Sequence, residues 1–263
     1  MNPWFTLLYQ PLVNALILLY KILGNNLGLA IIVLTLVIRS LLIPLTKPSL
    51  EAAKKIKALA PELEKLKKKY KKNKQALAQA QIELYRKHGV NPSAGCLPQI
   101  IQILILIALF QAFNQVLRPD GDIIEKLNKI LYPSLQLIKV KAINTRFLYL
   151  DLTKPDFIQL PFHFNLLNLK IDKLPGIFLL AAAITQFLSS RLMMPVVKSE
   201  EEKAKKTPQQ EDDLTTMMQK QMLYMMPLMT LIIGFRFPSG LVLYWLTFSL
   251  FMFIQQLITR NQK

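Results

Sequence analysis

The feature that most constrains the fold is residues 27–46, LGLAIIVLTLVIRSLLIPLT, an apolar run that carries one charge, Arg39. A helix of about 20 apolar residues, rising about 1.5 Å per residue, crosses the roughly 30 Å hydrocarbon layer of a bilayer. The run therefore predicts a membrane-spanning helix with Arg39 inside that layer. Holding a guanidinium there costs at least about 2.5–3.5 kcal/mol, and arginine cannot avoid this cost by losing its proton.

Arg39 is thus expected to face water, a counter-charge or a polar cavity inside the protein. The alternative is that its side chain snorkels to the membrane surface. The nearer end of the run is seven residues away, which is about 10 Å by helix rise and long for one side chain. A polar environment inside the protein is therefore the favoured interpretation.

The composition supports an integral membrane protein. Hydrophobic residues make up 52% of the chain, yet its formal net charge is +17. The apolar runs argue against the other source of such a charge, a basic nucleic-acid-binding protein, so no specific nucleic-acid partner is expected. The single cysteine, Cys96, excludes an intramolecular disulfide, and two histidines, His88 and His163, make a metal site or histidine-based catalysis unexpected.

The N-terminal residues 1–26 lack the basic start and the small-residue cleavage site of a signal peptide. Pro3 and Pro11 are expected to break this segment and to leave about a dozen apolar residues. That length suits an amphipathic helix at the outer membrane interface better than a span. The alternative is a sixth span that turns tightly through residues 24–26.

Residues 47–92, between two apolar runs, are rich in lysine. Apolar residues recur at steps of three and four from Ile56 to Tyr70, and a second apolar set follows from Leu77 to Tyr85. This pattern predicts a helical hairpin whose two apolar seams face each other. A short basic loop between spans stays in the cytoplasm, and anionic lipid headgroups attract it.

The remaining apolar runs predict an all-α integral membrane protein with five transmembrane helices and a cytoplasmic helical hairpin. Five crossings place every lysine-rich loop in the cytoplasm, the N-terminus outside and the C-terminus inside. The outer residues 117–174 are not assigned to helices or strands. The expected segments are an outer interfacial helix (1–26), transmembrane helix 1 (27–46), the hairpin (47–92), transmembrane helix 2 (96–116), an outer segment (117–174), transmembrane helix 3 (175–194), a cytoplasmic linker (195–218), transmembrane helix 4 (219–235) and transmembrane helix 5 (241–258).

Polar residues inside the spans are the candidate functional positions. Gln99 and Gln102 lie about one turn apart in the second span, and Gln186 lies in the third. Amides at this depth join helices or line a wet groove shared with Arg39. Four methionines in the fourth span suit either apolar partners of varied shape or ordinary packing. No nucleotide-binding loop, metal-ligand spacing or nucleophile–base pair is present, so the chain is not expected to be an enzyme.

These features follow one another in a recognisable order. The chain resembles the YidC membrane-protein insertases, relatives of the Oxa-type and Alb-type proteins, through TLVIRSLLIPLT, the basic hairpin, NPSAGCLPQIIQ, the methionine-rich span, FPSGLVLYW and a final IQQLI. The match is poorest over 117–174 and 195–216. The chain is expected to be the minimal five-span form, without the extra outer domain of some members. It also lacks a long basic tail, which implies that ribosome binding is weak.

The resemblance implies an insertase and folding chaperone of the bacterial inner membrane, with no cofactor. Its partners would be nascent membrane proteins and the lipid bilayer. It would bind the ribosome weakly and would act alone or with the Sec translocon. Arg39 would be the positive charge of a hydrophilic groove that opens to the cytoplasm and to lipid but is closed outside. Gln102, Gln186 and Trp245 would line this groove, with Thr35 near the arginine. Hydrophobic segments with short polar flanks would pass through it.

Two other functions fit parts of the pattern. A small-anion channel or transporter could use Arg39 as its selectivity charge. It predicts solute flux and pseudo-symmetric halves, but the halves are not alike and the hairpin has no role in it. A structural subunit of a larger membrane complex predicts a partner that copurifies in a fixed ratio.

Overall fold

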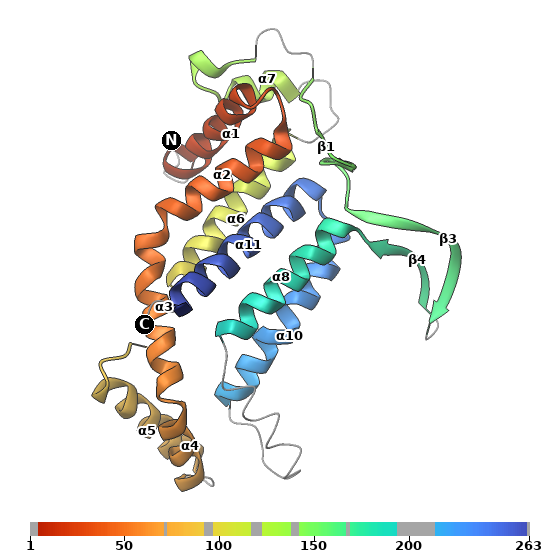
Figure 1. Ribbon diagram of the computed structural model, residues 1–263. Helices are drawn as coiled ribbons and strands as arrows, with labels where there is room; N and C mark the ends of the chain where they lie inside the picture. Colours follow the sequence, from red (N-terminus) through yellow and green to blue (C-terminus); the bar gives the residue numbers. More distant parts are fainter. Residues whose placement is uncertain are drawn as a thin grey trace.

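The computed structural model describes residues 5–70, 73–91, 97–116, 123–137, 142–166, 169–193 and 214–261. Its body is a set of helices that run side by side (Figure 1): α2 (Leu27–Leu41), α6 (Leu97–Val116), α8 (Ile177–Met193), α10 (Leu214–Gly234) and α11 (Ser239–Asn261). α11 packs against both α2 and α8, and α10 packs on α8. The mostly helical fold, with apolar helices, confirms the predicted all-α membrane class.

Several helices have the length and composition of a membrane span. Two described helices qualify alone, Phe5–Ile22 and Ser239–Thr259, and a third span exists if the bent pair Leu27–Leu41 and Ile43–Ile56 is counted as one. Shorter apolar helices lie at the other predicted spans, at Ile100–Ala112, Ile177–Leu192 and Leu223–Gly234. Five crossings therefore remain a prediction. The predicted linker 195–218 lies mostly outside the described residues, and α10 begins at Leu214 instead of the predicted 219.

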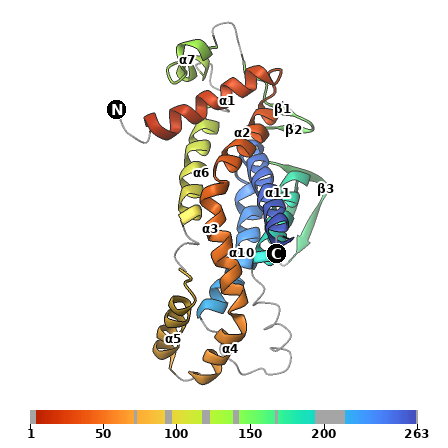
Figure 2. The same ribbon diagram turned by 60° about the vertical axis from the view of Figure 1, so that its left-hand side comes forward.

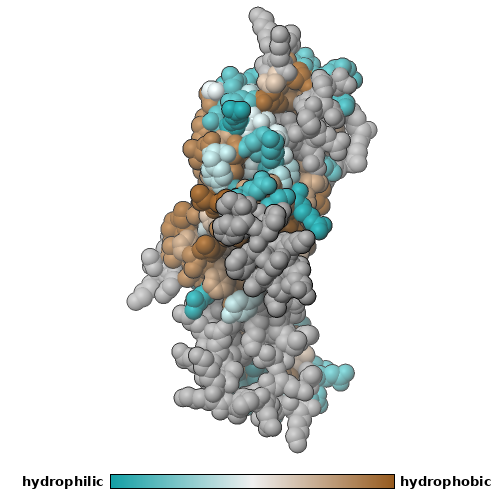
Figure 3. Space-filling model, turned by 90° about the vertical axis from the view of Figure 1, so that its right-hand side faces the viewer, coloured by the Kyte–Doolittle hydropathy of each residue, from teal (hydrophilic) through white to brown (hydrophobic). Residues whose placement is uncertain are grey.

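Apolar side chains lie on the outside of this body, as a bilayer requires. Ile184 on α8 and Ile232 on α10 are 58% and 56% exposed. Figure 3 shows apolar surface on the described helices, next to more hydrophilic surface toward the upper end. In water such an exposed apolar surface favours aggregation, whereas in a bilayer the lipid chains cover it.

Residues 27–46 do not form one uninterrupted helix. α2 ends at Leu41, and α3 (Ile43–Ala58) starts after Leu42 with a bend of 60°. Pro44 accounts for the break, because a proline has no N–H for the preceding turn and its ring crowds the residue before it. α3 then continues through Pro48 and carries the chain out of the body (Figure 2).

The expectation that Pro11 breaks the N-terminal segment is wrong. A π-helical turn, η1 (Phe5–Tyr9), runs directly into α1 (Gln10–Ile22). Pro11 falls in the first turn of α1, where a missing N–H is tolerated. Figure 2 shows α1 lying across the end of the bundle at a steep angle to α2 and α6. That placement suits an interfacial helix, but the length suits a span as well, so the interfacial location stays a prediction.

The basic hairpin consists of α4 (Ala60–Lys69) and α5 (Lys74–Lys87), which project from one end of the body (Figure 1). Leu63 and Leu77 are buried in it, as the predicted seams require. His88 Nε2 lies 3.5 Å from Glu62 Oε2 and links the two helices. Two details differ from the prediction: the first helix breaks near residue 59, and Ile82, expected in the seam, is 61% exposed.

The other end of the body carries the segment that the sequence left unassigned. It contains α7 (Ile123–Asn128), the short 3-10 helix η3 (Pro133–Leu135), and two antiparallel pairs, β1 (Arg146–Phe147) with β2 (Leu150–Asp151) and β3 (Phe157–Leu166) with β4 (Leu169–Pro175). Asn14 of α1 is buried and its Oδ1 accepts from the Tyr132 N–H at 2.7 Å. Lys21 Nζ donates to the Leu135 carbonyl at 2.8 Å. These contacts attach α1 to the loop after α7.

Candidate functional site

Arg39 lies in the last turn of α2 and points into the helical body, where only 6% of its surface is exposed. Its Nη2 donates to Gln102 Oε1 of α6. Gln102 Nε2 in turn donates to the Tyr244 hydroxyl of α11 at 2.5 Å. Arg39 Cζ lies 3.7 Å from the centre of the Phe248 ring, also on α11. We call these four residues the Arg39 cluster; it joins three helices and argues against the snorkelling alternative.

The Arg39 cluster holds a positive charge without a carboxylate. The ion pairs found among the described residues join surface groups such as Glu125 and Lys129, and none of them includes Arg39. An amide oxygen and an aromatic face compensate part of the cost of burial. They do not neutralise the charge, so a carboxylate that reached Arg39 would be strongly attracted in a medium of low dielectric constant.

The structure brings only some of the predicted site residues together. Thr35, 2% exposed, lies one turn before Arg39 and donates to the Ile31 carbonyl at 2.6 Å. Gln186 accepts instead from Thr230 Oγ1 at 2.6 Å, between α8 and α10. The ring of Trp245 is half-buried and packs edge-on near Phe237, with centroids 6.4 Å apart. A water-filled groove around Arg39 remains a prediction, and Gln99 is outside the described side chains.

Other polar side chains connect neighbouring helices of the body. Ser189 Oγ of α8 donates to Gln256 Oε1 of α11 at 3.2 Å, and both residues are buried. With the Gln186–Thr230 contact, α8 is hydrogen-bonded through side chains to α10 and to α11. Amides and hydroxyls at such positions join helices that have no hydrophobic drive to associate within lipid.

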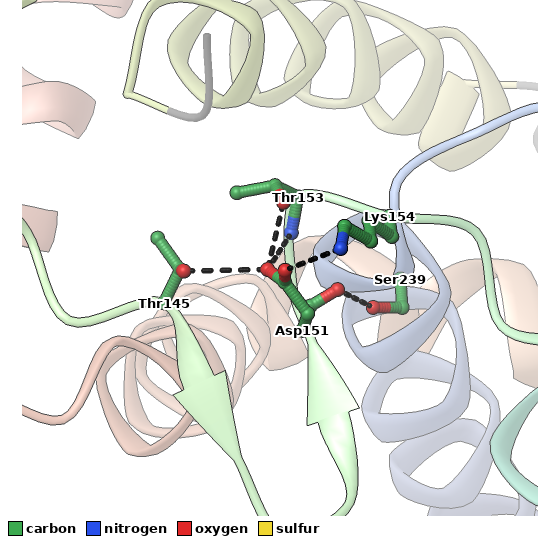
Figure 4. A network of polar contacts seen from close by, with 5 residues as sticks. All are labelled: Thr145, Asp151, Thr153, Lys154 and Ser239. Atoms are coloured by element: carbon green, nitrogen blue, oxygen red, sulfur yellow. Dashed lines mark hydrogen bonds and ion pairs between the residues drawn. The ribbon is translucent and has the colours of Figure 1, made fainter. Parts of the chain in front are cut away.

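The N-terminus of α11 is fixed by the loop around β2. Figure 4 shows Ser239 Oγ donating to the Asp151 carbonyl, at 2.9 Å. The Ser239 N–H donates to the Lys154 carbonyl at 2.7 Å. The Asp151 carboxylate accepts from Thr153 Oγ1 at 2.7 Å and from Thr145 Oγ1 at 3.3 Å. Backbone donors that a helix start leaves unpaired are thus satisfied.

The same loop fixes the starts of α8 and α2. Asp156, 2% exposed, accepts from the Leu179 N–H at 2.8 Å and from the Tyr149 hydroxyl at 2.9 Å. Burial, together with the hydrogen bond to Asp156, raises the pKa of Tyr149. Phe147 of β1 packs so closely on Gly28 of α2 that a Cβ there would lie 2.2 Å from the ring. We call residues 145–156 the end clamp, because they hold the same end of three helices.

Comparison with known proteins adds the family to this geometry. The profile of the family described as 60Kd inner membrane protein matches residues 18–263. The chain belongs to this family. It is similar to the membrane protein insertase YidC of Fusobacterium nucleatum subsp. nucleatum, with 34% identity over 233 residues that cover 88% of this chain and 85% of that protein.

Further relatives carry similar names. The membrane protein insertase MisCA of Bacillus subtilis is 30% identical over 263 residues, covering 98% of this chain and 79% of that protein. The membrane protein insertase YidC 1 of Halalkalibacterium halodurans is 32% identical over 256 residues, which cover 96% of this chain and 77% of that protein. The resemblance seen in the sequence is therefore confirmed. These names support an insertase function in a bacterial inner membrane, and they describe insertion, not a catalysed reaction.

The site residues predicted from the sequence did not include two members of the Arg39 cluster, Tyr244 and Phe248. They are four residues apart in LVLYWLTFSL and so share one face of α11. Trp245, which the resemblance selected, is the neighbour of Tyr244 and lies about 100° around the helix. The spacing alone could have found the pair, but it could not show that this face points at α2.

Proposed function

We propose that this chain inserts hydrophobic segments with short polar flanks into the bilayer and assists their folding. The observation that carries the proposal is Arg39, a buried cation with no carboxylate among the described partners. An acidic residue in an incoming flank would replace Gln102 Oε1 as the acceptor of the guanidinium. The guanidinium bonds either acceptor, but a carboxylate adds a full opposite charge that the neutral amide lacks, so the Coulomb attraction in a medium of low dielectric constant favours the flank.

The route requires water to enter around the Arg39 cluster from the cytoplasmic side. Water partway through the bilayer shortens the hydrocarbon distance that a polar flank must cross. Partition of about 20 apolar residues into lipid then drives the step. α10 offers an apolar wall for the departing segment, because Met225, Leu228 and Met229 are each nearly half exposed. No nucleotide hydrolysis is needed in this scheme.

The proposed topology places the N-terminus outside and the C-terminus in the cytoplasm. Support comes from the two ends of the body: the lysine-rich hairpin α4–α5 and the end clamp lie at opposite ends (Figure 1), and basic loops stay inside. In this orientation the end clamp closes the outer side, and the hairpin meets substrates first. We further propose action alone or with the Sec translocon, and weak contact with the ribosome.

The test is insertion of a substrate with an acidic translocated flank into vesicles that contain the purified chain. Arg39→Ala should abolish insertion, whereas Arg39→Lys should retain most of it, because Coulomb attraction needs the charge more than the forked geometry. Arg191→Ala, which removes an exposed arginine from the last turn of α8, is the matched control. Normal insertion by the Arg39→Ala variant would overturn the proposal, and so would equal losses in both alanine variants. Chloride flux through the same vesicles would instead indicate an anion channel.

A further inference from the structure

A hollow lies between α2–α3 and α11, and its lining includes no member of the Arg39 cluster. We call it the α2–α11 groove; its volume is about 940 Å³. Aliphatic side chains make up most of its walls, among them Leu36 and Ile43 on one side and Leu250 and Ile254 on the other. These four side chains are between 39% and 54% exposed, so the groove is open along its side.

The α2–α11 groove is nearly as long as a bilayer is thick. Leu243 and Thr259 of α11 both line it, and sixteen residues of helix span about 24 Å. Leu148, at the tip of the β1–β2 hairpin, lines the groove too. A hydrocarbon chain can therefore lie against apolar side chains over most of the roughly 30 Å layer.

One end of the groove is charged. Lys47, Glu51 and Lys54 of α3 all line it there, at spacings that place them on one face of the helix. Lys54 Nζ also donates to the Thr259 carbonyl of α11, which fixes this lysine at the mouth. The three side chains carry one net positive charge beside an apolar channel.

From this geometry we infer that the α2–α11 groove binds an anionic phospholipid, with its acyl chains on the aliphatic walls and its phosphate at Lys47 and Lys54. A transmembrane helix fits the length as well. However, the proposed topology puts the lysines at the cytoplasmic surface, where the flanks of a helix are themselves basic and would be repelled. Anionic headgroups are attracted by about 1 kcal/mol for each basic residue near the surface. The site goes beyond the proposed insertase function, and only its orientation rests on that proposal.

Native mass spectrometry of the full chain in detergent, titrated with phosphatidylglycerol or phosphatidylcholine, tests the inference. The first phosphatidylglycerol should bind about fivefold more tightly than phosphatidylcholine, as expected for two lysines offset by one glutamate. Lys47→Gln with Lys54→Gln should remove this preference. Lys65→Gln with Lys68→Gln, two exposed positions on α4, is the matched control and should keep it.

A second variant tests the apolar wall without changing charge. Leu250→Trp should fill the groove and weaken the first binding event of both lipids at least tenfold, while thermal unfolding in detergent without lipid stays near that of the parent. Three results would overturn the inference: no preference for phosphatidylglycerol, an equal loss in the Lys65 and Lys68 control, or undiminished lipid binding by Leu250→Trp. Displacement of lipid by a second copy of the chain would overturn it too. The Arg39→Ala insertion assay is independent, so failure of one proposal leaves the other intact.

Discussion

At the scale of single residues, the Arg39 cluster explains how a bilayer protein keeps a guanidinium inside. Gln102 accepts from the guanidinium and donates to Tyr244, while the Phe248 ring faces the cation. Each partner is neutral, so the charge stays available to an anion. A carboxylate in the place of Gln102 would stabilise Arg39 more strongly and would cancel the attraction that the proposed function needs.

The Tyr244 hydroxyl gives a prediction at this scale. Tyr244→Phe leaves the buried Gln102 Nε2 without the acceptor that it has now, and an unsatisfied buried donor costs about 1–3 kcal/mol. We expect a lower unfolding temperature in detergent, because the Gln102 side chain loses its hydrogen bond to α11. Tyr132→Phe, at a side chain that is 43% exposed, is the control and should change the free energy of unfolding by less than about 0.5 kcal/mol. Equal stability of the two variants would contradict the role given to Tyr244.

At the scale of elements, the sequence predicted the helices better than it predicted their interruptions. The spacing of apolar residues and the lengths of the apolar runs identified the apolar helices and the basic hairpin. The break at Leu42 and the break near residue 59 each come just before a proline, whereas Pro11 follows η1 without a break. Pro48 and Pro227 lie inside α3 and α10, so the presence of a proline alone does not predict an interruption. The strands were not predicted because β1 and β2 are only 2 residues long each and the register of β3 with β4 is irregular, so neither pair gives a sustained alternation in the sequence.

The end clamp gives a prediction of pH dependence. Burial by itself raises the pKa of Asp151, but hydrogen bonds from Thr153 and attraction by Lys154 outweigh it and leave this pKa below its ordinary value. A carboxyl with a lowered pKa contributes stability above its unfolded pKa, and this contribution is lost as the pH falls through the folded pKa. The contribution is at most about 1 kcal/mol, since the Asp151–Lys154 pair is exposed.

Unfolding temperatures between pH 7 and pH 3 measure this contribution. Asp151→Asn should lower the unfolding temperature at pH 7 and should reduce its fall toward pH 3, because asparagine does not titrate. Glu83→Gln, at an exposed carboxylate of α5, is the control and should keep the pH profile of the parent. Parallel profiles for the parent and the Asp151→Asn variant would refute the contribution of Asp151.

At the scale of the whole molecule, the two ends of the body differ in kind. The end clamp ties α2, α8 and α11 together by backbone and side-chain contacts, whereas α3 leaves the opposite end at an angle and leads to a separate hairpin (Figure 2). The positions of the lysine-rich segments between the apolar runs predicted that the two ends of the body differ. They could not predict that Gln186 bonds to Thr230 and that Trp245 packs near Phe237, because helix rotation is set by packing between distant segments.

Access to the Arg39 cluster is the prediction that belongs to the whole molecule. In a Cys96→Ser background, Gln102→Cys should react with a membrane-impermeant maleimide added from the cytoplasmic side, because the proposed route admits water there. Ala108→Cys, at a fully buried position of α6, is the control and should not react. A cysteine at position 102 that stays unlabelled in the folded protein would mean that the bundle is sealed, and the proposed route would fail.

The bend after Leu41 has one more consequence. A helix that ends leaves carbonyl groups without intrahelical donors, and its aligned peptide dipoles give that terminus about half a negative charge. Arg39 occupies the final turn of α2, so the backbone itself supplies a fractional counterion that no mutation of a side chain removes. In an uninterrupted span that terminus would lie about a turn or more away, and the guanidinium would lose this part of its compensation.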